Sequence, residues 1–202
     1  RDVLGSRGLG DVYKRQVQNN GIINHYEYII NSEGTIEIRH VLKPEGKMPL
    51  WFPRIGLTLT VSDALDQVKW YGRGPQENYP DRKTGYPMGI YASTVQAMYE
   101  PYLMPQDYGL RTDVRWLQLT TDKGIGLQFK MNEWFNFNIY PYSTDNLTKA
   151  MYTYQLQKQK GMTLNLDYAT TGVGCTARGV FGAYKAMPQE YRRTISIRPM
   201  MK

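Results

Sequence analysis

Residues 55–61 read Ile-Gly-Leu-Thr-Leu-Thr-Val, an alternation of large apolar side chains with small or polar ones. Successive side chains of a β-strand point to opposite faces of the sheet, so a period of two places all four large apolar residues on one face. Two of the remaining positions, Thr58 and Thr60, are β-branched, which favours a strand further. We therefore predict a strand with one face buried in a hydrophobic core.

The same alternation recurs along the chain, at residues 36–39, 68–70, 125–129, 135–139, 164–166 and 195–197. Turn signals ending in glycine lie at 32–34 and 122–124, where glycine can adopt a positive φ. Only residues 145–151 read as a helical turn, with Ser143 or Thr144 as its N-cap. Roughly nine or ten strands without a βαβ pattern predict an all-β fold, a large antiparallel sandwich forming one domain.

Composition excludes several other classes of protein. The chain has 202 residues, 41% hydrophobic and 21% charged, which is enough for one packed domain. Its net charge is +7, but the basic residues are scattered, so we expect no nucleic-acid partner. No apolar run reaches the length of a membrane-spanning helix, so we expect no membrane partner either. A single cysteine, Cys175, excludes an intrachain disulfide and a cysteine-rich metal site.

Residues 1–16 differ from the rest of the chain. They are rich in glycine and arginine and show no sustained apolar period. We interpret them as a tail or loop of non-native, artefactual origin, and assign the domain to residues 17–202.

The segment 70–82, WYGRGPQENYPDR, concentrates special residues at the end of a predicted strand. Glycines and prolines predict an irregular loop, whose polar side chains commonly satisfy backbone groups. We expect Glu77, Asp81 and Arg82 to form an ion-pair network that holds this loop, and we favour a structural loop over a binding site. Its structural signature positions are Gly74, Pro75, Gln76, Glu77, Asn78, Tyr79, Asp81 and Arg82.

As a string, GPQENYPDR resembles the signature of the C-terminal domain of family 2 glycoside hydrolases, the long β-galactosidases. The resemblance continues in order on both sides, at PRIGL (53–57), MYEPY (98–102), PQDYGLR (105–111), FNFNI (135–139) and GVG (172–174). It covers roughly residues 26 to 199. Because the family's domain begins well before residue 26, the resemblance implies a domain that is incomplete on its N-terminal side.

The resemblance implies a supersandwich similar to galactose mutarotase-like folds, docked against a catalytic TIM barrel in a homo-oligomeric parent. The family hydrolyses terminal, non-reducing β-D-galactose residues with retention, using two glutamates on the barrel. Neither glutamate's motif is present here, so we expect no catalytic residue in this chain. The Mg²⁺ of the family is also bound on the barrel, so we expect no cofactor or metal ligand here. A bacterial parent would be cytoplasmic or periplasmic.

In some family members the loop after GVG continues to a tryptophan that forms part of the sugar-binding wall. Here residues 174–179 read GCTARG, and Gly179 falls where that tryptophan would be. The preceding residue, Arg178, can instead donate hydrogen bonds to sugar hydroxyls. Cys175, Thr176 and Arg178 are therefore weak candidates for carbohydrate contact, and a plain turn near the mouth of the barrel is the favoured interpretation.

Two alternatives from other classes remain, a stand-alone carbohydrate-binding module and an aldose-1-epimerase-like enzyme. An epimerase would need a histidine beside a carboxylate in a sugar-sized cleft. His40 lies in phase with Ile36 and Ile38, so we expect it to be buried and hydrogen-bonded rather than catalytic, and His25 to be exposed. A cluster of aromatic side chains on the surface would instead favour the module.

Overall fold

A computed structural model describes residues 11–17, 20–175 and 179–201, which form an almost entirely β-structure. Its strands are β1 (Asp11–Val17), β2 (Asn20–Ile30), β3 (Ile36–Glu45), β4 (Arg54–Val61), β5 (Gln67–Arg73), β6 (Met88–Thr94), β7 (Arg111–Thr120), β8 (Gly126–Tyr140), β9 (Met162–Thr170) and β10 (Tyr191–Met200). One short helix, α1 (Thr144–Lys149), and two 3-10 turns, Thr153–Gln155 and Gly182–Tyr184, complete the described elements.

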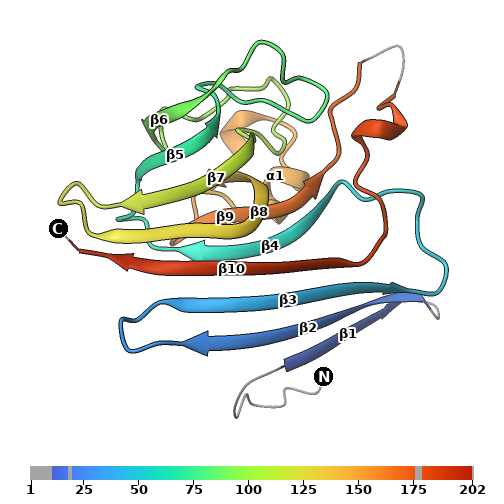
Figure 1. The fold of residues 1–202 in the computed structure, drawn as a ribbon. Coiled ribbons are helices and arrows are strands. Elements are labelled where there is room, and N and C mark those ends of the chain that lie inside the picture. The colour runs from blue at the N-terminus through green and yellow to red at the C-terminus, as the bar shows by residue number, and fades with distance from the viewer. Residues whose placement is uncertain (1–10, 18–19, 176–178, 202) are drawn as a thin grey trace.

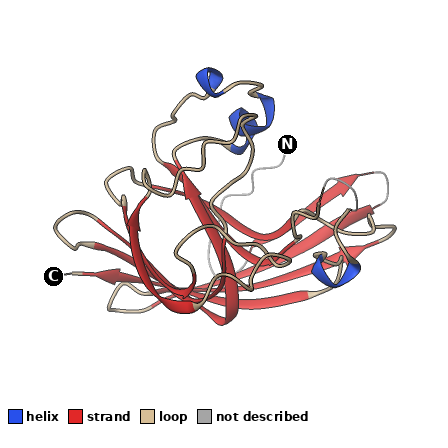
Figure 2. Ribbon diagram, turned by 90° about the horizontal axis from the view of Figure 1, so that it is seen from above, coloured by secondary structure: helices blue, strands red, loops and turns tan. Residues whose placement is uncertain are grey.

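All the strands belong to one antiparallel sheet that folds back on itself (Figure 1). The main path runs β1-β2-β3-β10-β8-β7-β5-β6, while β9 pairs with β8, and β4 pairs with β9. Strand β8 makes the fold-back possible because it changes partner: residues 126–131 pair with β10, and residues 136–140 pair with β9. Figure 2 shows the strands curving around a common interior. The predicted all-β sandwich is therefore confirmed.

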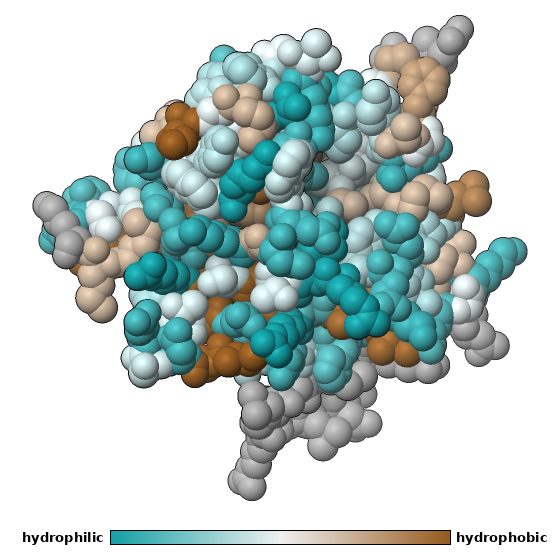
Figure 3. Space-filling view, in the orientation of Figure 1, coloured by the Kyte–Doolittle hydropathy of each residue, from teal (hydrophilic) through white to brown (hydrophobic). Residues whose placement is uncertain are grey.

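The hydrophobic core fills the space that this fold-back encloses. Along β5 the buried residues alternate with more exposed ones, as the period of two requires. The largest fully buried side chains include Trp70, Phe129, Phe135, Phe137 and Leu166. On β4 the predicted inner face is confirmed, since Ile55 and Val61 are buried and Leu57 and Leu59 pack against the core. The surface seen in Figure 3 is largely hydrophilic, with separate hydrophobic groups.

The structure differs from the sequence prediction in the number of strands around β8. Residues 125–129 and 135–139 were expected to be two strands, but residues 126–129 and 135–139 lie in the single strand β8. Between the residues that pair with β10 and those that pair with β9, β8 changes partner without leaving the strand. The predicted turns at Gly34 and Gly124 are confirmed by φ values of 78° and 79°, and Ser143 caps α1. Strands β6 and β7 were not predicted.

Strand β1 corrects the expectation that residues 1–16 form a tail or loop. It begins at Asp11 and pairs with β2 from Asp11–Tyr26 to Val17–Asn20. An edge strand offers unpaired N–H and C=O groups, and these can hold a neighbouring segment whatever its side-chain period. The predicted domain boundary at residue 17 therefore cuts through a strand. Residues 1–10 lie outside the described part of the chain.

His40 on β3 is buried, with 2% of its surface exposed. Its Nδ1 lies 2.7 Å from the Tyr168 hydroxyl, its Nε2 lies 3.0 Å from Oδ1 of Asn24, and its ring stacks on Tyr26. Burial lowers the pKa of His40 to about 4. The prediction of a packed, hydrogen-bonded histidine is confirmed, and His25 is exposed as expected.

This burial predicts a dependence of stability on pH. In the unfolded chain a histidine binds a proton below about pH 6.5, whereas folded His40 stays neutral down to about pH 4. The free energy of unfolding should therefore fall by about 1.5 kcal/mol through His40 alone between pH 6.5 and pH 5.

Urea denaturation across this range should show a clearly shallower slope for His40→Gln than for the unsubstituted chain. The matched control is His25→Gln, which should keep the original slope because His25 is exposed. Parallel curves for all three proteins would contradict the assignment.

Candidate functional site

An open cleft of about 850 Å³ lies beside the loop that carries the GPQENYPDR signature. Tyr79 and Arg82 come from that loop, which we call the signature loop (residues 74–82). The lining also includes residues 170–173 and Val180, which lie at the two ends of the segment we call the glycine loop (residues 172–179). Two segments about ninety residues apart in the sequence therefore border one cleft, and Trp51 contributes an aromatic ring to the same lining.

Glu77 anchors the signature loop from within. Its carboxylate is 5% exposed and accepts four hydrogen bonds, from Arg82 at 2.8 Å, the Gly109 N–H at 2.9 Å, the Tyr79 hydroxyl at 3.2 Å and the Tyr102 hydroxyl. Burial by itself would raise the pKa of Glu77, but the hydrogen bonds from Tyr102, Gly109 and Arg82 hold it below its ordinary value. Glu77 is thus an ionised structural residue.

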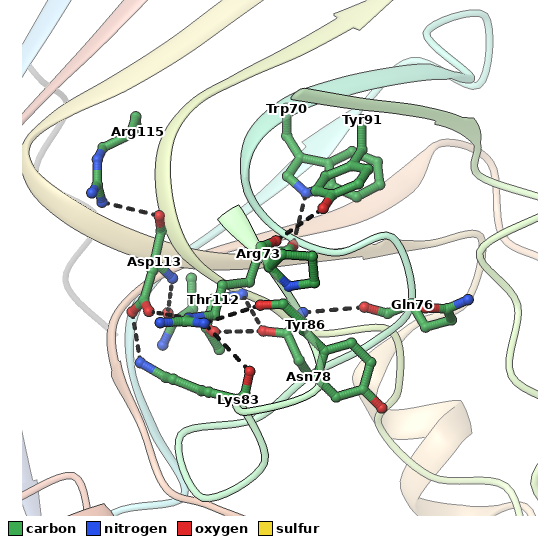
Figure 4. Close-up of polar contacts among 12 residues, drawn as sticks. Trp70, Arg73, Gln76, Asn78, Lys83, Tyr86, Tyr91, Thr112, Asp113 and Arg115 are labelled. Atoms are coloured by element: carbon green, nitrogen blue, oxygen red, sulfur yellow. Dashed lines mark hydrogen bonds and ion pairs between the residues drawn. The ribbon is translucent and has the colours of Figure 1, made fainter. Parts of the chain in front are cut away.

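Asn78 fastens the same loop to the start of β7. It is fully buried, and its Oδ1 accepts hydrogen bonds from the backbone N–H and the hydroxyl of Thr112. Its Nδ2 donates to the carbonyl of Gln76 (Figure 4). Its backbone N–H donates to the carbonyl of Leu110 at 2.8 Å. Both the oxygen and the nitrogen of this buried amide therefore have hydrogen-bond partners within the fold, so its burial is not penalised.

Asp113 holds the two ends of the signature loop together (Figure 4). Its carboxylate accepts hydrogen bonds from Arg73 Nε and Lys83 Nζ, each at 2.6 Å. Arg73 and Lys83 are the residues directly before and after the loop. Arg73 also donates to the carbonyls of Lys83 and Tyr86. Burial opposes ionisation of Asp113, but Lys83 and Arg73 outweigh it and keep its pKa low. Two ion pairs to the same carboxylate therefore hold the two ends of the loop close together.

Asp81 joins the signature loop to the glycine loop. Its Oδ1 accepts the backbone N–H of Val173 at 3.0 Å, and its Oδ2 accepts that of Gly174 at 2.7 Å. A Cβ at Gly172 would lie 2.3 Å from Cγ of Asp81, so this approach requires glycine. The predicted network of Glu77, Asp81 and Arg82 needs correction, because only Glu77 and Arg82 pair. Asp81 instead binds backbone amides of a distant segment, which no local pattern indicates.

The predicted carbohydrate-contact residues follow directly after this junction. Cys175 is exposed, and Val180, just beyond the segment, lines the cleft. Thr176 and Arg178 lie outside the described residues. The structure therefore places the two ends of the glycine loop at the cleft and leaves its predicted contacts untested.

Sequence reasoning missed a polar cluster that borders the cleft around Arg54. Its Nη2 lies 3.0 Å from Oδ2 of Asp167 and 3.3 Å from Oδ2 of Asp107, and it donates to Oδ1 of Asn138. Burial raises the pKa of Asp167 to about 7, against the opposing effect of Arg54. The sequence did contain a signal for this pair: Arg54 and Asp167 are charged residues within the apolar strands β4 and β9. Charged groups are rarely buried unless they are paired. Asp107 lies in a loop and gave no such signal.

Two further findings concern metals and membranes. Among residues 11–17, 20–175 and 179–201, no group of three or more His, Cys, Asp or Glu side chains could hold a metal ion. Within the same ranges, no helix is long and apolar enough to cross a membrane.

The junction at Asp81 yields a prediction about stability. Replacing it by alanine leaves two backbone N–H groups without their acceptor, so the free energy of unfolding should fall by about 1–3 kcal/mol. Hydrogen exchange at Val173 and Gly174 should accelerate more than elsewhere. Asp122→Ala, in an exposed hairpin turn, is the control and should change neither quantity. Unchanged exchange at Val173 and Gly174 would show that Asp81 does not hold the glycine loop.

Comparison with known proteins agrees with the motifs. The profile of the β-galactosidase small-chain family matches residues 9–197. The chain is 38% identical over 147 residues to a β-galactosidase of Priestia megaterium, which covers 73% of this chain and 14% of that protein. It is 39% identical over 122 residues to one from Vibrio cholerae, covering 60% and 11%. It is 33% identical over 159 residues to one from Pseudoalteromonas haloplanktis, covering 77% and 14%.

The chain thus spans a small part of each relative, 14% at most among these three. The match to the family profile, however, includes nearly all of the sheet, the signature loop and both sides of the cleft. The sequence resemblance is confirmed, and the chain belongs to the β-galactosidase small-chain family.

Proposed function

We propose that this chain is the small-chain domain of a β-galactosidase that hydrolyses terminal, non-reducing β-D-galactose residues. In this proposal the domain supports a catalytic TIM barrel and forms one wall of its substrate entrance. The observation that carries the proposal is the junction of Asp81 with the backbone of Val173 and Gly174, which fixes two loops beside one cleft. The relatives named above are β-galactosidases, which supports the same parent.

The cleft has the dimensions and lining that a short saccharide requires. Its volume of about 850 Å³ lies within the range common for small-molecule sites. Trp51 offers an aromatic surface to the apolar face of a sugar ring, and Arg82 offers hydrogen-bond donors to hydroxyls. Cys175, Thr176 and Arg178 would extend this wall from the glycine loop.

The chemistry of hydrolysis is assigned to the barrel. A retaining glycosidase needs one carboxyl group free to donate a proton and another free to attack the anomeric carbon. Asp107 lines the cleft but forms an ion pair with Arg54, and Asp167, which contacts the same guanidinium, is only 1% exposed and does not line the cleft. Glu77 accepts four hydrogen bonds and is held ionised. We assign the two catalytic glutamates and the Mg²⁺ of the family to the barrel, and a homo-oligomeric assembly to the parent.

The epimerase alternative has no support from the histidines. His40 is buried, and its ring nitrogens contact a tyrosine hydroxyl and an amide oxygen rather than a carboxylate. Neither His40 nor His25 lines the cleft.

The proposal predicts that the isolated 202-residue chain does not hydrolyse a chromogenic β-galactoside, because general acid and nucleophile are both absent. The parent enzyme purified in the same way should show full turnover, which controls for the assay. Turnover by the isolated chain that is absent from a mock purification would refute the assignment of catalysis to the barrel.

A second prediction tests the wall of the cleft in the full-length parent. Arg178→Ala should raise KM by about 3- to 10-fold and leave kcat unchanged, because it removes a contact made equally in ground state and transition state. Lys123→Ala, in an exposed turn, is the matched control. An unchanged KM for Arg178→Ala would leave the glycine loop as a plain turn.

A further inference from the structure

The outer surface of β5, β7 and β8 carries aromatic side chains that neither the core nor the cleft uses. On these strands the inward positions are occupied by Val68, Trp70, Leu117, Leu119 and Phe129, each 1% exposed or less. The residues between them therefore point away from the core. Tyr71 on β5 lies directly opposite Trp116 on β7, with ring centroids 6.4 Å apart.

An arginine extends this pair to a third ring. The register of β7 against β8 shifts between Val114 and Trp116, so Arg115 escapes the strict alternation and joins the outer surface. Its Cζ lies 3.4 Å from the ring centroid of Trp134 and 5.9 Å from that of Tyr71. We name Tyr71, Arg115, Trp116 and Trp134 the aromatic platform.

The rings of the platform are exposed to solvent, which is unfavourable for large apolar side chains. Trp134 is 58% exposed and Tyr71 is 37% exposed. Arg115 stacks on one side of Trp134 and donates to the carbonyl of Asp113 (Figure 4). That contact pins the guanidinium beneath the ring. Rings held in place at a surface offer contact area without a large loss of side-chain entropy on binding.

Cations and amides surround the rings. Lys130 lies opposite Trp116, and Gln118 lies opposite Lys69. Gln128 lies opposite Gln118 on one side and opposite Arg198 on the other. All of these side chains are on the same outer face of the sheet. Within the described part of the chain, no carboxylate pairs with Lys69, Lys130 or Arg198. The surface therefore combines exposed rings, hydrogen-bonding amides and unneutralised positive charge.

We propose that the aromatic platform binds an acidic polysaccharide, one that carries carboxylate or sulfate groups. Sugar rings present apolar C–H faces that pack on Tyr71 and Trp134, and hydroxyls that hydrogen-bond to Gln118. The anionic substituents complement Lys69 and Lys130. This site is separate from the cleft and holds whether or not the chain belongs to an active β-galactosidase.

Other partners fit this surface less well. The core of a protein–protein interface is depleted in lysine, whereas Lys69 and Lys130 flank the rings closely. Single-stranded nucleic acids are bound in positively charged grooves that follow the backbone, with stacking on successive rings. Here the rings of Tyr71 and Trp116 are tilted by 54° on the face of a sheet.

The test measures the affinity of the full chain for polygalacturonate by affinity electrophoresis at low salt. Trp134→Ala and Tyr71→Ala should each weaken binding at least tenfold, and the double variant Lys69→Ala/Lys130→Ala should weaken it and reduce its dependence on salt. The control is Tyr154→Ala, which removes a 79% exposed ring elsewhere and should bind normally. Thermal melts of every variant should match the unsubstituted chain, because all these side chains are at the surface.

Three results would overturn the proposal. The first is no retardation by polygalacturonate, and the second is retardation that the ring and lysine variants leave unchanged. The third is equal retardation by a neutral galactan or by a single-stranded oligonucleotide with the same sensitivity to the variants, since that would assign the platform to another ligand. If Trp134→Ala fails to fold, Tyr71→Ala and the lysine variant still decide between these outcomes.

Discussion

The ion pairs of Asp113 with Arg73 and Lys83 hold the structure at the point where its sheet bends. Asp113 has a φ of 56°, in the left-handed region that non-glycine residues rarely adopt, and it lies where β7 loses register with β8. Such a conformation costs on the order of 1–3 kcal/mol and persists only when the surroundings enforce it. Two contacts of 2.6 Å and a short-range hydrogen bond of Arg115 to the Asp113 carbonyl provide that enforcement.

Three features of the molecule depend on this bend. Beyond it β8 leaves β10 and pairs with β9, so one continuous sheet encloses a core. Arg73 and Lys83 flank the signature loop, so the same ion pairs close its base and set one side of the cleft. The register shift also places Arg115 beside Trp134 on the outer surface. The cleft and the aromatic platform are thus two consequences of one irregularity in β7.

Charge in this domain is used chiefly to hold loops. Glu77 binds Arg82 and the backbone N–H of Gly109. Asp81 binds the backbone N–H of Gly174, and Asp113 binds Arg73. Removing one partner of such a buried contact leaves the other unsatisfied, which is why these carboxylates resist replacement. Carboxylates engaged in this way are poor candidates for acid–base chemistry, which is consistent with the supporting role proposed above.

The sequence by itself determined the fold class and the family. Alternation such as that of residues 55–61 is a local property of a chain with one buried face, and a string such as GPQENYPDR needs no coordinates to be recognised. Tertiary structure alone decided which segments meet. The pairing of Asp81 with residues 173 and 174, the change of partner within β8 and the stacking of Arg115 on Trp134 join positions whose separation along the chain carries no periodic signal. These contacts depend on how the strands are paired and folded back, because only the pairing of β7 with β8 and the fold-back of the sheet bring these residues together.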